Sequence, residues 1–235
     1  MTQLTKTISI AAVETRSPEA VIRAINSTLL CTPASKVYWV SNYPCPVEFS
    51  VPTQWVRVRD CLPPRDQFNL WYSWITLRLL PSVVDTDFNI IVQNDGYAVN
   101  KSAWTDEFLD YDYIGAPWLW WGPPEEQVGN GGFSLRSRRL YDALIDWQPS
   151  YRIDGWPDLD PKYYSPNSRD GLNEDNLLAG PYRKYLEERY QLRWAPVDLA
   201  HQWSIECSES YSNPWFKRSL GFHGRETAQH YGIEL

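Results

Sequence analysis

Short apolar segments alternate with amphipathic segments along the first half of the chain. The apolar segments are expected as β-strands at residues 6–13, 36–41, 54–58 and 88–92. Between them, apolar side chains recur every three or four residues over residues 18–30 and 65–80, which is the spacing of helices with one buried face. Strands that alternate with helices predict an α/β domain, in which helices cover both faces of a mostly parallel, Rossmann-like central sheet.

A serine and two prolines mark the ends of the two predicted helices. Ser17 suits the N-cap position of the first helix, and Pro18 suits its first turn, where a missing N–H loses no helical hydrogen bond. Pro81 is expected to end the second helix, because proline disrupts a helix interior.

The second half of the chain has a less regular pattern. It predicts short strands at residues 113–116 and 193–199, helices over residues 137–147 and 182–190, and a further short helix from Asn173. A polar and aromatic segment, residues 148–170, interrupts this pattern, and long loops of this kind are usually functional. No internal repeat or linker composition divides the chain, so we expect one domain over residues 1–235.

The charge balance and the absence of apolar runs exclude several classes of protein. With 22 Lys and Arg against 29 Asp and Glu, the net charge is −7, and no basic stripe is present, which argues against a nucleic-acid binder. The chain has no run of about 18 apolar residues, so no integral membrane segment is expected. Its N-terminal segment lacks the pattern of a secretory signal, and its four cysteines form no Cys-x-x-Cys pair. We therefore expect a soluble cytoplasmic protein with reduced thiols; peripheral membrane association stays open, and the oligomeric state is not indicated.

Aromatic residues are unusually frequent, with 13 Trp and 15 Tyr. So many large rings with polar N–H or O–H groups are difficult to bury completely, so some of them are expected to face a groove. Four tryptophans lie in predicted strands or helices and are expected in the core instead: Trp39, Trp71, Trp74 and Trp194.

Polar residues follow two of the predicted parallel strands, at residues 13–16 and 93–96. Ligands of open α/β sheets bind outside the carboxyl ends of the strands, so both segments are candidates for a binding site. Asp95 follows a buried strand, and its carboxylate is the kind of oxygen ligand that a hard divalent cation requires. The alternative interpretation is that Asp95 and Gly96 form only a turn.

A glycine-rich segment, GNGGFSL, spans residues 129–135. Three glycines within four residues leave backbone N–H groups accessible to a ligand and permit positive φ. The segment has neither the Lys-Ser/Thr of a P-loop nor the spacing of a dinucleotide-binding fingerprint. A tight turn packed under a neighbouring strand is the alternative.

Two further polar segments lie later in the chain. Asn173 suits an N-cap position, which places Glu174 and Asp175 in a first helical turn. There the two acids either stabilise the helix dipole or supply a general base. His223 is flanked by glycines and is interpreted as a metal ligand or pH-active group, or alternatively as a loop histidine bonded to backbone.

Together and in this order, the four segments resemble the motifs of the GT-A glycosyltransferase superfamily. The DxD region corresponds to residues 93–96, the G-loop to 129–134, the xED motif to 173–175 and the C-terminal histidine to His223. In particular, the stretches YIGAPW, VGNGGFSLRS and NEDN look like those of a group of small GT-A-like proteins. The chain departs from the DxD pattern, because Asp95 is the only acid in that region.

The resemblance implies a GT-A-like fold and an activity. Residues 1–96 would form the nucleotide-binding half and residues 97–235 the acceptor-binding half. The implied enzyme transfers a sugar from a nucleoside-diphosphate sugar to a hydroxyl of a carbohydrate or glycoconjugate, with inversion at the anomeric carbon. By this analogy Asp175 is the general base, and Glu174 binds the donor sugar or the acceptor.

The resemblance also assigns the metal and the two substrates to particular residues. Mn²⁺ or Mg²⁺ would be held by Asp95, His223 and the diphosphate oxygens of the donor. The donor nucleotide is expected to contact Val13, Glu14, Thr15, Arg16, Asn94, Asp95, Gly131 and Gly132. Aromatic rings stack on the C–H faces of sugars, so the acceptor is expected at Trp118, Trp120, Trp121, Trp156 and Tyr163.

Two other functions would use part of the same residues. A non-catalytic carbohydrate-binding protein would explain exposed aromatic rings, but it has no need of an acid pair beside a G-loop. A metal-dependent sugar-nucleotide hydrolase or phosphodiesterase would use Asp95 and His223 and release its products without an acceptor. The sequence does not indicate the nucleotide, the sugar or the linkage.

Overall fold

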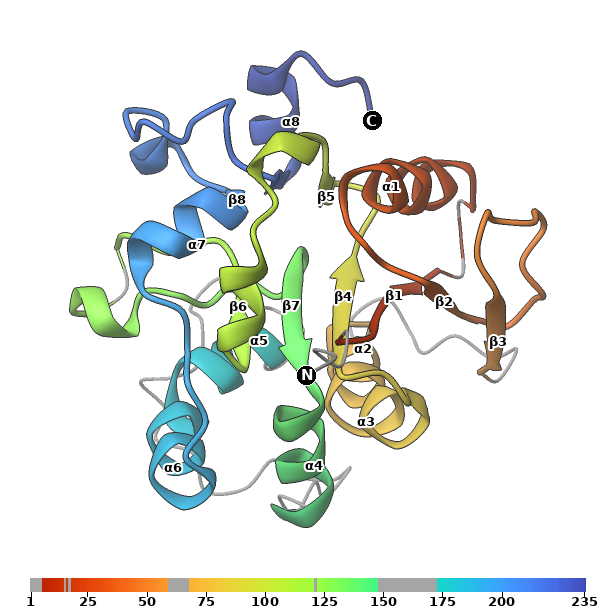
Figure 1. Ribbon diagram of the computed structural model, residues 1–235, viewed down its shortest axis with the longest axis horizontal. Coiled ribbons are helices and arrows are strands. Elements are labelled where there is room, and N and C mark those ends of the chain that lie inside the picture. Colours follow the sequence, from red (N-terminus) through yellow and green to blue (C-terminus); the bar gives the residue numbers. More distant parts are fainter. Residues whose placement is uncertain (1–5, 15, 17, 59–67, 121, 148–172) are drawn as a thin grey trace, which may run out of the picture.

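The computed structural model describes residues 6–14, 16, 18–58, 68–120, 122–147 and 173–235. Within these residues the chain forms an α/β domain on a six-stranded sheet, with a three-stranded sheet beside it (Figure 1). The predicted fold class, a mostly parallel central sheet with helices around it, is confirmed.

The six-stranded sheet has the strand order β3-β2-β1-β4-β7-β6. Its strands are β1 (Ile8–Val13), β2 (Lys36–Ser41), β3 (Thr53–Arg57), β4 (Phe88–Val92), β6 (Tyr113–Ile114) and β7 (Ser134–Ser137). Strands β1 to β4 are parallel, whereas β7 is antiparallel to both of its neighbours. The carboxyl ends of β1 and β4 therefore meet at one edge of the sheet, the edge where open α/β sheets bind ligands.

The three-stranded sheet has the order β5-β9-β8, with β5 (Gly96–Ala98), β8 (Ser204–Ile205) and β9 (Gly221–His223). β5 follows β4 after a tight turn and pairs antiparallel with β9, so that Gly96 lies opposite His223. This pairing brings the C-terminal part of the chain to the carboxyl end of β4.

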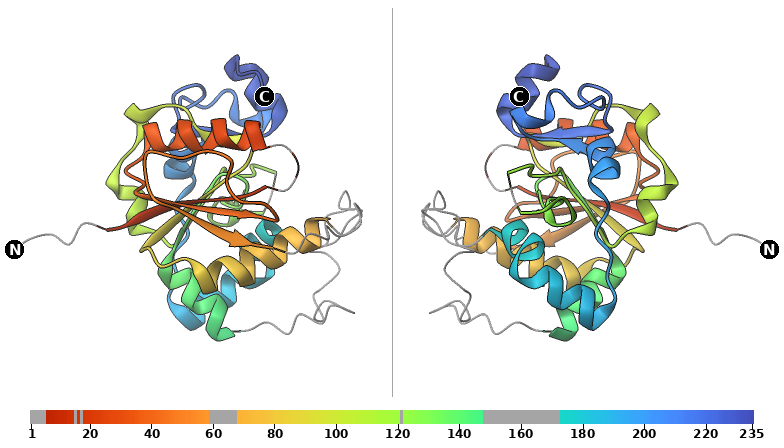
Figure 2. Two further views of the ribbon diagram at one scale, coloured as in Figure 1. Left: turned by 90° about the vertical axis from the view of Figure 1, so that its right-hand side faces the viewer. Right: turned by 90° about the vertical axis from the view of Figure 1, so that its left-hand side faces the viewer.

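Helices pack on both faces of the six-stranded sheet. Figure 2 shows α1 on one face and the α2–α3 segment with α4 on the other. The helices are α1 (Pro18–Cys31), α2 (Phe68–Trp74), α3 (Leu80–Val83), α4 (Arg138–Trp147), α5 (Glu174–Ala179), α6 (Pro181–Tyr190), α7 (Val197–Trp203) and α8 (Arg225–Tyr231). A π-helical segment (Ile75–Leu79) joins α2 to α3, and 3₁₀ turns span Lys101–Ala103, Asp106–Asp110, Pro124–Glu126 and Ser208–Ser210. Among the described helices, none combines the length and the apolar character needed to cross a membrane.

A cluster of aromatic rings anchors the glycine-rich segment to the core. Trp203, fully buried at the end of α7, stacks on Phe133 with ring centroids 4.8 Å apart and meets Phe108 edge to face. Its indole N–H donates to the carbonyl of Phe133 over 2.9 Å. The end of the glycine-rich segment is therefore fixed by packing and by a buried hydrogen bond at once.

Two expectations are wrong, one about where a helix ends and one about a strand. The helix expected to end at Pro81 continues to Val83, because Pro81 lies in the first turn of α3, where its missing N–H has no helical partner to lose. The strand expected at residues 193–199 is limited to one bridge between Trp194 and Tyr113. Pro196 takes the N-cap position of α7, so the helix-start pattern prevails over the apolar run.

Other local expectations hold more closely. The strands at residues 36–41 and 88–92 and the start of the first helix at Pro18 are confirmed, whereas Ser17 lies outside the described residues. Strand β7 was not predicted, because residues 134–137 were expected only to lead into a helix. Among the tryptophans expected in the core, Trp39 and Trp194 are buried and Trp71 is partly buried. Trp74 is 46% exposed, so its expected core position is wrong.

The cysteine prediction holds within the described residues. Cys31, Cys45 and Cys207 are free thiols, and Cys61 lies outside those residues.

A buried polar network joins α4 to the middle of the sheet. The Tyr141 hydroxyl donates to Asn89 Oδ1 over 2.9 Å, and Asn89 Nδ2 donates to Ser9 Oγ over 2.8 Å. Ser9 Oγ in turn lies 2.6 Å from the hydroxyl of Thr86. Each of these groups is buried, so each depends on the next for its hydrogen bond.

We predict that Tyr141→Phe lowers the free energy of unfolding by about 1–3 kcal/mol, because it leaves Asn89 Oδ1 buried without its donor. Urea denaturation measures this change. Tyr185→Phe is the matched control, because Tyr185 is 41% exposed on α6, and it should leave the midpoint unchanged. Equal midpoints for the two variants would contradict the role of the network.

Candidate active site

Two adjoining pockets open at the carboxyl ends of β1 and β4. The first, the β1 pocket, has a volume of about 360 Å³, and the second, the acid pocket, about 190 Å³. Residues of the β1 pocket include Val13, Glu14, Arg16, Phe68, Asn94 and Arg225. Residues of the acid pocket include Gly132, Asn173, Glu174, Asp175 and His223. Asn69, Tyr72 and Gln93 line both pockets, so the two lie side by side, and together they are called the cleft below.

The acid pair begins helix α5, as the sequence predicts. Asn173 takes the N-cap position but makes no capping hydrogen bond with its side chain. Glu174 is 4% exposed and forms an ion pair over 3.1 Å with Arg136, which is fully buried on β7. A buried carboxylate requires such a partner, and Arg136 supplies it.

Asp175 lies against the glycine-rich segment. Its Oδ2 accepts a hydrogen bond from the Gly131 N–H over 3.1 Å. Burial, together with the neighbouring charge of Glu174, raises the pKa of Asp175 to about 7. A carboxylate with this pKa exchanges protons near neutral pH, as a general base must.

The glycine-rich segment is held in shape by Asn130 and by close contacts. Asn130 Oδ1 accepts from the N–H groups of Gly132 (3.0 Å) and Phe133 (3.3 Å). A Cβ on Gly131 would overlap Glu174 Oε1, and one on Gly132 would overlap the His223 ring. These glycines are therefore required by close packing rather than by positive φ, which neither of them adopts.

His223 is held by an acid that sequence reasoning missed. Its Nδ1 lies 3.0 Å from Glu206 Oε1 and its Nε2 lies 3.2 Å from Gln93 Oε1. Burial opposes protonation of the imidazole, but the hydrogen bond and charge of Glu206 outweigh it and raise the pKa of His223 to about 9. Glu206 also accepts from Trp118 Nε1 (2.6 Å) and Asn130 Nδ2 (2.8 Å). Nothing in the local sequence distinguishes this acid, because its partners come from distant segments.

The proposed metal ligands are Asp95, in the turn between β4 and β5, and His223, on β9. Gly224 N donates to the carbonyl of Asp95, which ties the segment after His223 to the turn before β5. Both ring nitrogens of His223 already have partners, and the described residues contain no group of three or more His, Cys, Asp or Glu side chains that could hold a metal ion. A cation at Asp95 and His223 would thus need oxygen atoms from a bound ligand as well. The metal assignment stays a prediction.

Four of the eight expected nucleotide contacts line the β1 pocket. Val13, Glu14, Arg16 and Asn94 line it, and the Arg16 guanidinium lies 4.2 Å from the centre of the Phe68 ring. Thr15 lies outside the described residues. Helix α2 and Arg225 of helix α8 also line the cleft, and neither was identified from the sequence.

The expected acceptor aromatics have different environments. Trp118 is 6% exposed, with its ring against Gly129, whereas Trp120 is 58% exposed and stacks on Trp118 at a centroid distance of 6.4 Å. The ring of Trp120 is therefore accessible to a ligand, whereas the ring of Trp118 is not. The other three expected residues, Trp121, Trp156 and Tyr163, lie outside the described residues.

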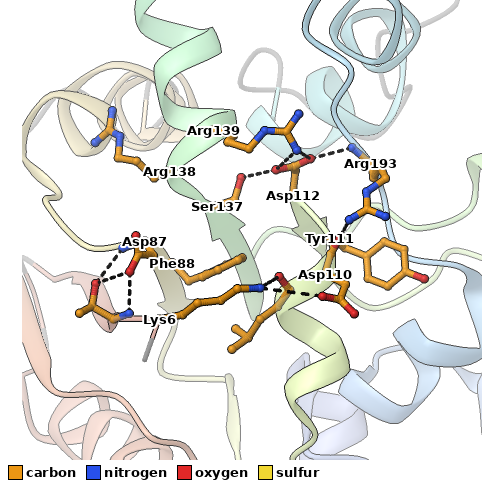
Figure 3. Close-up of a pocket in the computed structure, with 12 residues that line it drawn as sticks. Lys6, Asp87, Phe88, Asp110, Tyr111, Asp112, Ser137, Arg138, Arg139 and Arg193 are labelled. Carbon is orange, nitrogen blue, oxygen red and sulfur yellow. Dashed lines mark hydrogen bonds and ion pairs between the residues drawn. The ribbon is translucent and has the colours of Figure 1, made fainter. Parts of the chain in front are cut away.

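A larger pocket, of about 570 Å³, lies at the amino-terminal ends of β1 and β4 (Figure 3). Several of its polar groups are hydrogen-bonded to neighbouring residues. Asp112 accepts from Ser137 (2.6 Å) and Arg139 (3.0 Å), and Lys6 donates to the carbonyl of Leu109 (2.6 Å). These contacts fasten the ends of the sheet to α4, and we assign the pocket no part in the chemistry.

Comparison with solved structures identifies the fold class. The chain is similar to the crystal structure of a glycosyltransferase involved in the glycosylation of the major capsid of PBCV-1. The TM-score is 0.52 at 13% sequence identity, with 96% of this chain and 98% of the other covered. At this identity the likeness establishes a shared fold. The chain belongs to the family described as "Protein of unknown function (DUF5672)", whose model matches residues 76–223, more than half of its length. No curated protein sequence matches it.

We predict that Glu206→Gln lowers the pKa of His223 from about 9 toward or below the ordinary histidine value, because the stabilising negative charge is lost while burial remains. Imidazole resonances in an NMR titration measure this, and the chain has only three histidines to assign. Glu226→Gln, an exposed acid on α8, is the control and should leave the titration unaltered. An unchanged His223 titration in Glu206→Gln would show that Glu206 does not set this pKa.

Proposed function

We propose that this protein is a glycosyltransferase that moves a sugar from a nucleoside-diphosphate sugar to a hydroxyl of a carbohydrate or glycoconjugate. One observation carries the proposal. Asp175, a carboxylate with a raised pKa, lines the acid pocket, which adjoins the β1 pocket with its two arginines, Arg16 and Arg225. The β1 pocket suits an anionic nucleotide, and the acid pocket suits the sugar and the attacking hydroxyl.

The proposed reaction is a single displacement with inversion. The acceptor oxygen bonds to the anomeric carbon while the bond from that carbon to the diphosphate oxygen breaks. The electron pair of the broken bond leaves with the nucleoside diphosphate, and the acceptor proton passes to the Asp175 carboxylate. The transition state resembles an oxocarbenium ion, as in other glycosyl transfers.

Several groups of the cleft have defined tasks in this scheme. Glu174, paired with Arg136, raises the pKa of Asp175 and would face the sugar. The N–H of Gly131 keeps the Asp175 carboxylate oriented. Arg16 and Arg225 offer positive charge to the diphosphate. Trp120, with its exposed ring, would stack on an acceptor sugar.

A divalent cation fits the donor set only in part. Asp95, with diphosphate oxygens of the donor, would hold Mn²⁺ or Mg²⁺, which would neutralise charge on the leaving group, and His223 would join them only by giving up its contact with Gln93. The steps assigned above to Asp175 and the arginines do not depend on it.

We predict that Asp175→Asn lowers kcat for sugar transfer about 10²- to 10⁴-fold, because the general base is lost. Asparagine has nearly the same shape, but its single oxygen can accept from only one of the Gly131 and Asn176 N–H groups, so we expect a modest fall in melting temperature and a donor affinity close to that of the wild type. Product formation from a sugar nucleotide and an acceptor measures the rate.

Asp142→Asn is the matched control, because Asp142 is an exposed acid on α4 that pairs with Arg138. It should keep the wild-type rate. Wild-type turnover in Asp175→Asn would remove Asp175 as the base. Release of free sugar by the wild type at the same rate with and without acceptor would instead identify a hydrolase.

A further inference from the structure

A line of hydrogen bonds crosses the cleft from Glu206 to Tyr72. Glu206 Oε1 lies 3.0 Å from His223 Nδ1, and His223 Nε2 lies 3.2 Å from Gln93 Oε1. Gln93 Nε2 then donates to the Tyr72 hydroxyl oxygen over 2.8 Å. The four side chains come from the segment after β8, from β9, from the end of β4 and from α2, so the line depends on the assembled fold.

The line has a fixed polarity. The Gln93 amide directs its oxygen to the histidine and its NH₂ group to Tyr72. With Nδ1 facing the Glu206 carboxylate, His223 donates from Nδ1 to that acid, and a proton on Nε2 lets the ring also donate to the Gln93 oxygen. Tyr72 therefore accepts a hydrogen bond from Gln93. In the described part of the chain no acceptor takes the hydrogen of the Tyr72 hydroxyl.

Tyr72 lies where the two pockets meet. With Asn69 and Gln93 it lines both the β1 pocket and the acid pocket. A donor with its nucleotide in the β1 pocket and its sugar in the acid pocket places the bond between sugar and diphosphate at this junction. The oxygen that gains negative charge as that bond breaks thus lies beside the Tyr72 hydroxyl.

We propose that Tyr72 is a catalytic residue whose hydroxyl donates a hydrogen bond to the departing diphosphate of the donor. Gln93, His223 and Glu206 are positioning residues that keep the hydroxyl hydrogen turned toward the substrate. No proton is transferred in this contact: the phenol stays neutral, and the electron pair leaves with the nucleoside diphosphate. The inference rests on the proposed function.

The environment of Tyr72 suits a neutral donor. Burial and the nearby charge of Glu174 raise the pKa of Tyr72 far above its usual value, so the hydroxyl keeps its hydrogen at physiological pH. A fixed donor aimed at developing charge in a partly dry site stabilises the transition state without reorganising. Loss of one such donor typically costs about 10²- to 10³-fold in kcat.

The first test compares Tyr72→Phe with the wild type, using UDP, GDP, ADP and CDP, their sugar conjugates and the corresponding nucleosides as probes. The variant removes a single oxygen atom. For the nucleotide that binds the wild type, calorimetry should show that Tyr72→Phe binds the nucleoside diphosphate about 10-fold more weakly and binds the nucleoside with unchanged affinity. The kcat with the matching sugar conjugate should fall about 100-fold. Tyr185→Phe, exposed on α6, should match the wild type in every assay.

The second test concerns the positioning residues. Gln93→Glu keeps the shape of the side chain but replaces the donor to Tyr72 with a carboxylate, which accepts the hydroxyl hydrogen and turns it away from the substrate. The kcat of Gln93→Glu should fall as far as that of Tyr72→Phe. The variant with both substitutions should have a kcat no lower than that of either single variant. Melting temperatures show that the fold is retained. Additive losses would overturn the positioning role.

The outcomes separate the two proposals. If Tyr72→Phe binds the diphosphate and turns over like the wild type, the role of Tyr72 is overturned and the proposed function stands. If the wild type binds no nucleoside diphosphate and transfers no sugar, the proposed function fails and the role of Tyr72 falls with it. Selective loss of diphosphate affinity together with kcat supports both.

Discussion

The buried ion pair between Glu174 and Arg136 is the contact on which the candidate site depends. Arg136 lies on β7, between β4 and β6. Glu174, its partner, lies 38 residues later in the sequence and begins α5. Removing one partner of a buried pair typically costs about 3–5 kcal/mol, because the other charge is left without compensation. The pair therefore fixes the start of α5 against the sheet, and it fixes Asp175 beside Gly131.

The glycine-rich segment fills the space between these charges. Gly131 lies so close to Glu174, Asp175 and Arg136 that no side chain fits there. On its other side, Gly132 meets His223 and Gln93. Phe133 is held by Trp203. A segment of three residues thus contacts the acid pair, the histidine line and the aromatic core.

Much of the fold and part of the site could be predicted from the sequence, because they depend on local patterns. The apolar runs at residues 36–41 and 88–92 are strands, and Asp175 begins a helix next to the glycines. Glu206 and Tyr72 could not be found this way. Their roles arise from contacts across the fold, such as the one between Gln93 and His223, which lie 130 residues apart. Trp74 and Trp118 show the same limit, since their burial is decided by neighbours that are distant in the sequence.

The most direct test of the account is the melting temperature of the wild-type protein with nucleoside-diphosphate sugars, measured with and without Mn²⁺. A ligand that binds only the folded state stabilises it by about 2.7 kcal/mol at a hundred times its Kd. The account predicts that the sugar conjugates of one nucleoside diphosphate raise the melting temperature, and that Mn²⁺ increases the shift if Asp95 and His223 hold a cation. No shift with any sugar nucleotide at millimolar concentration would contradict it.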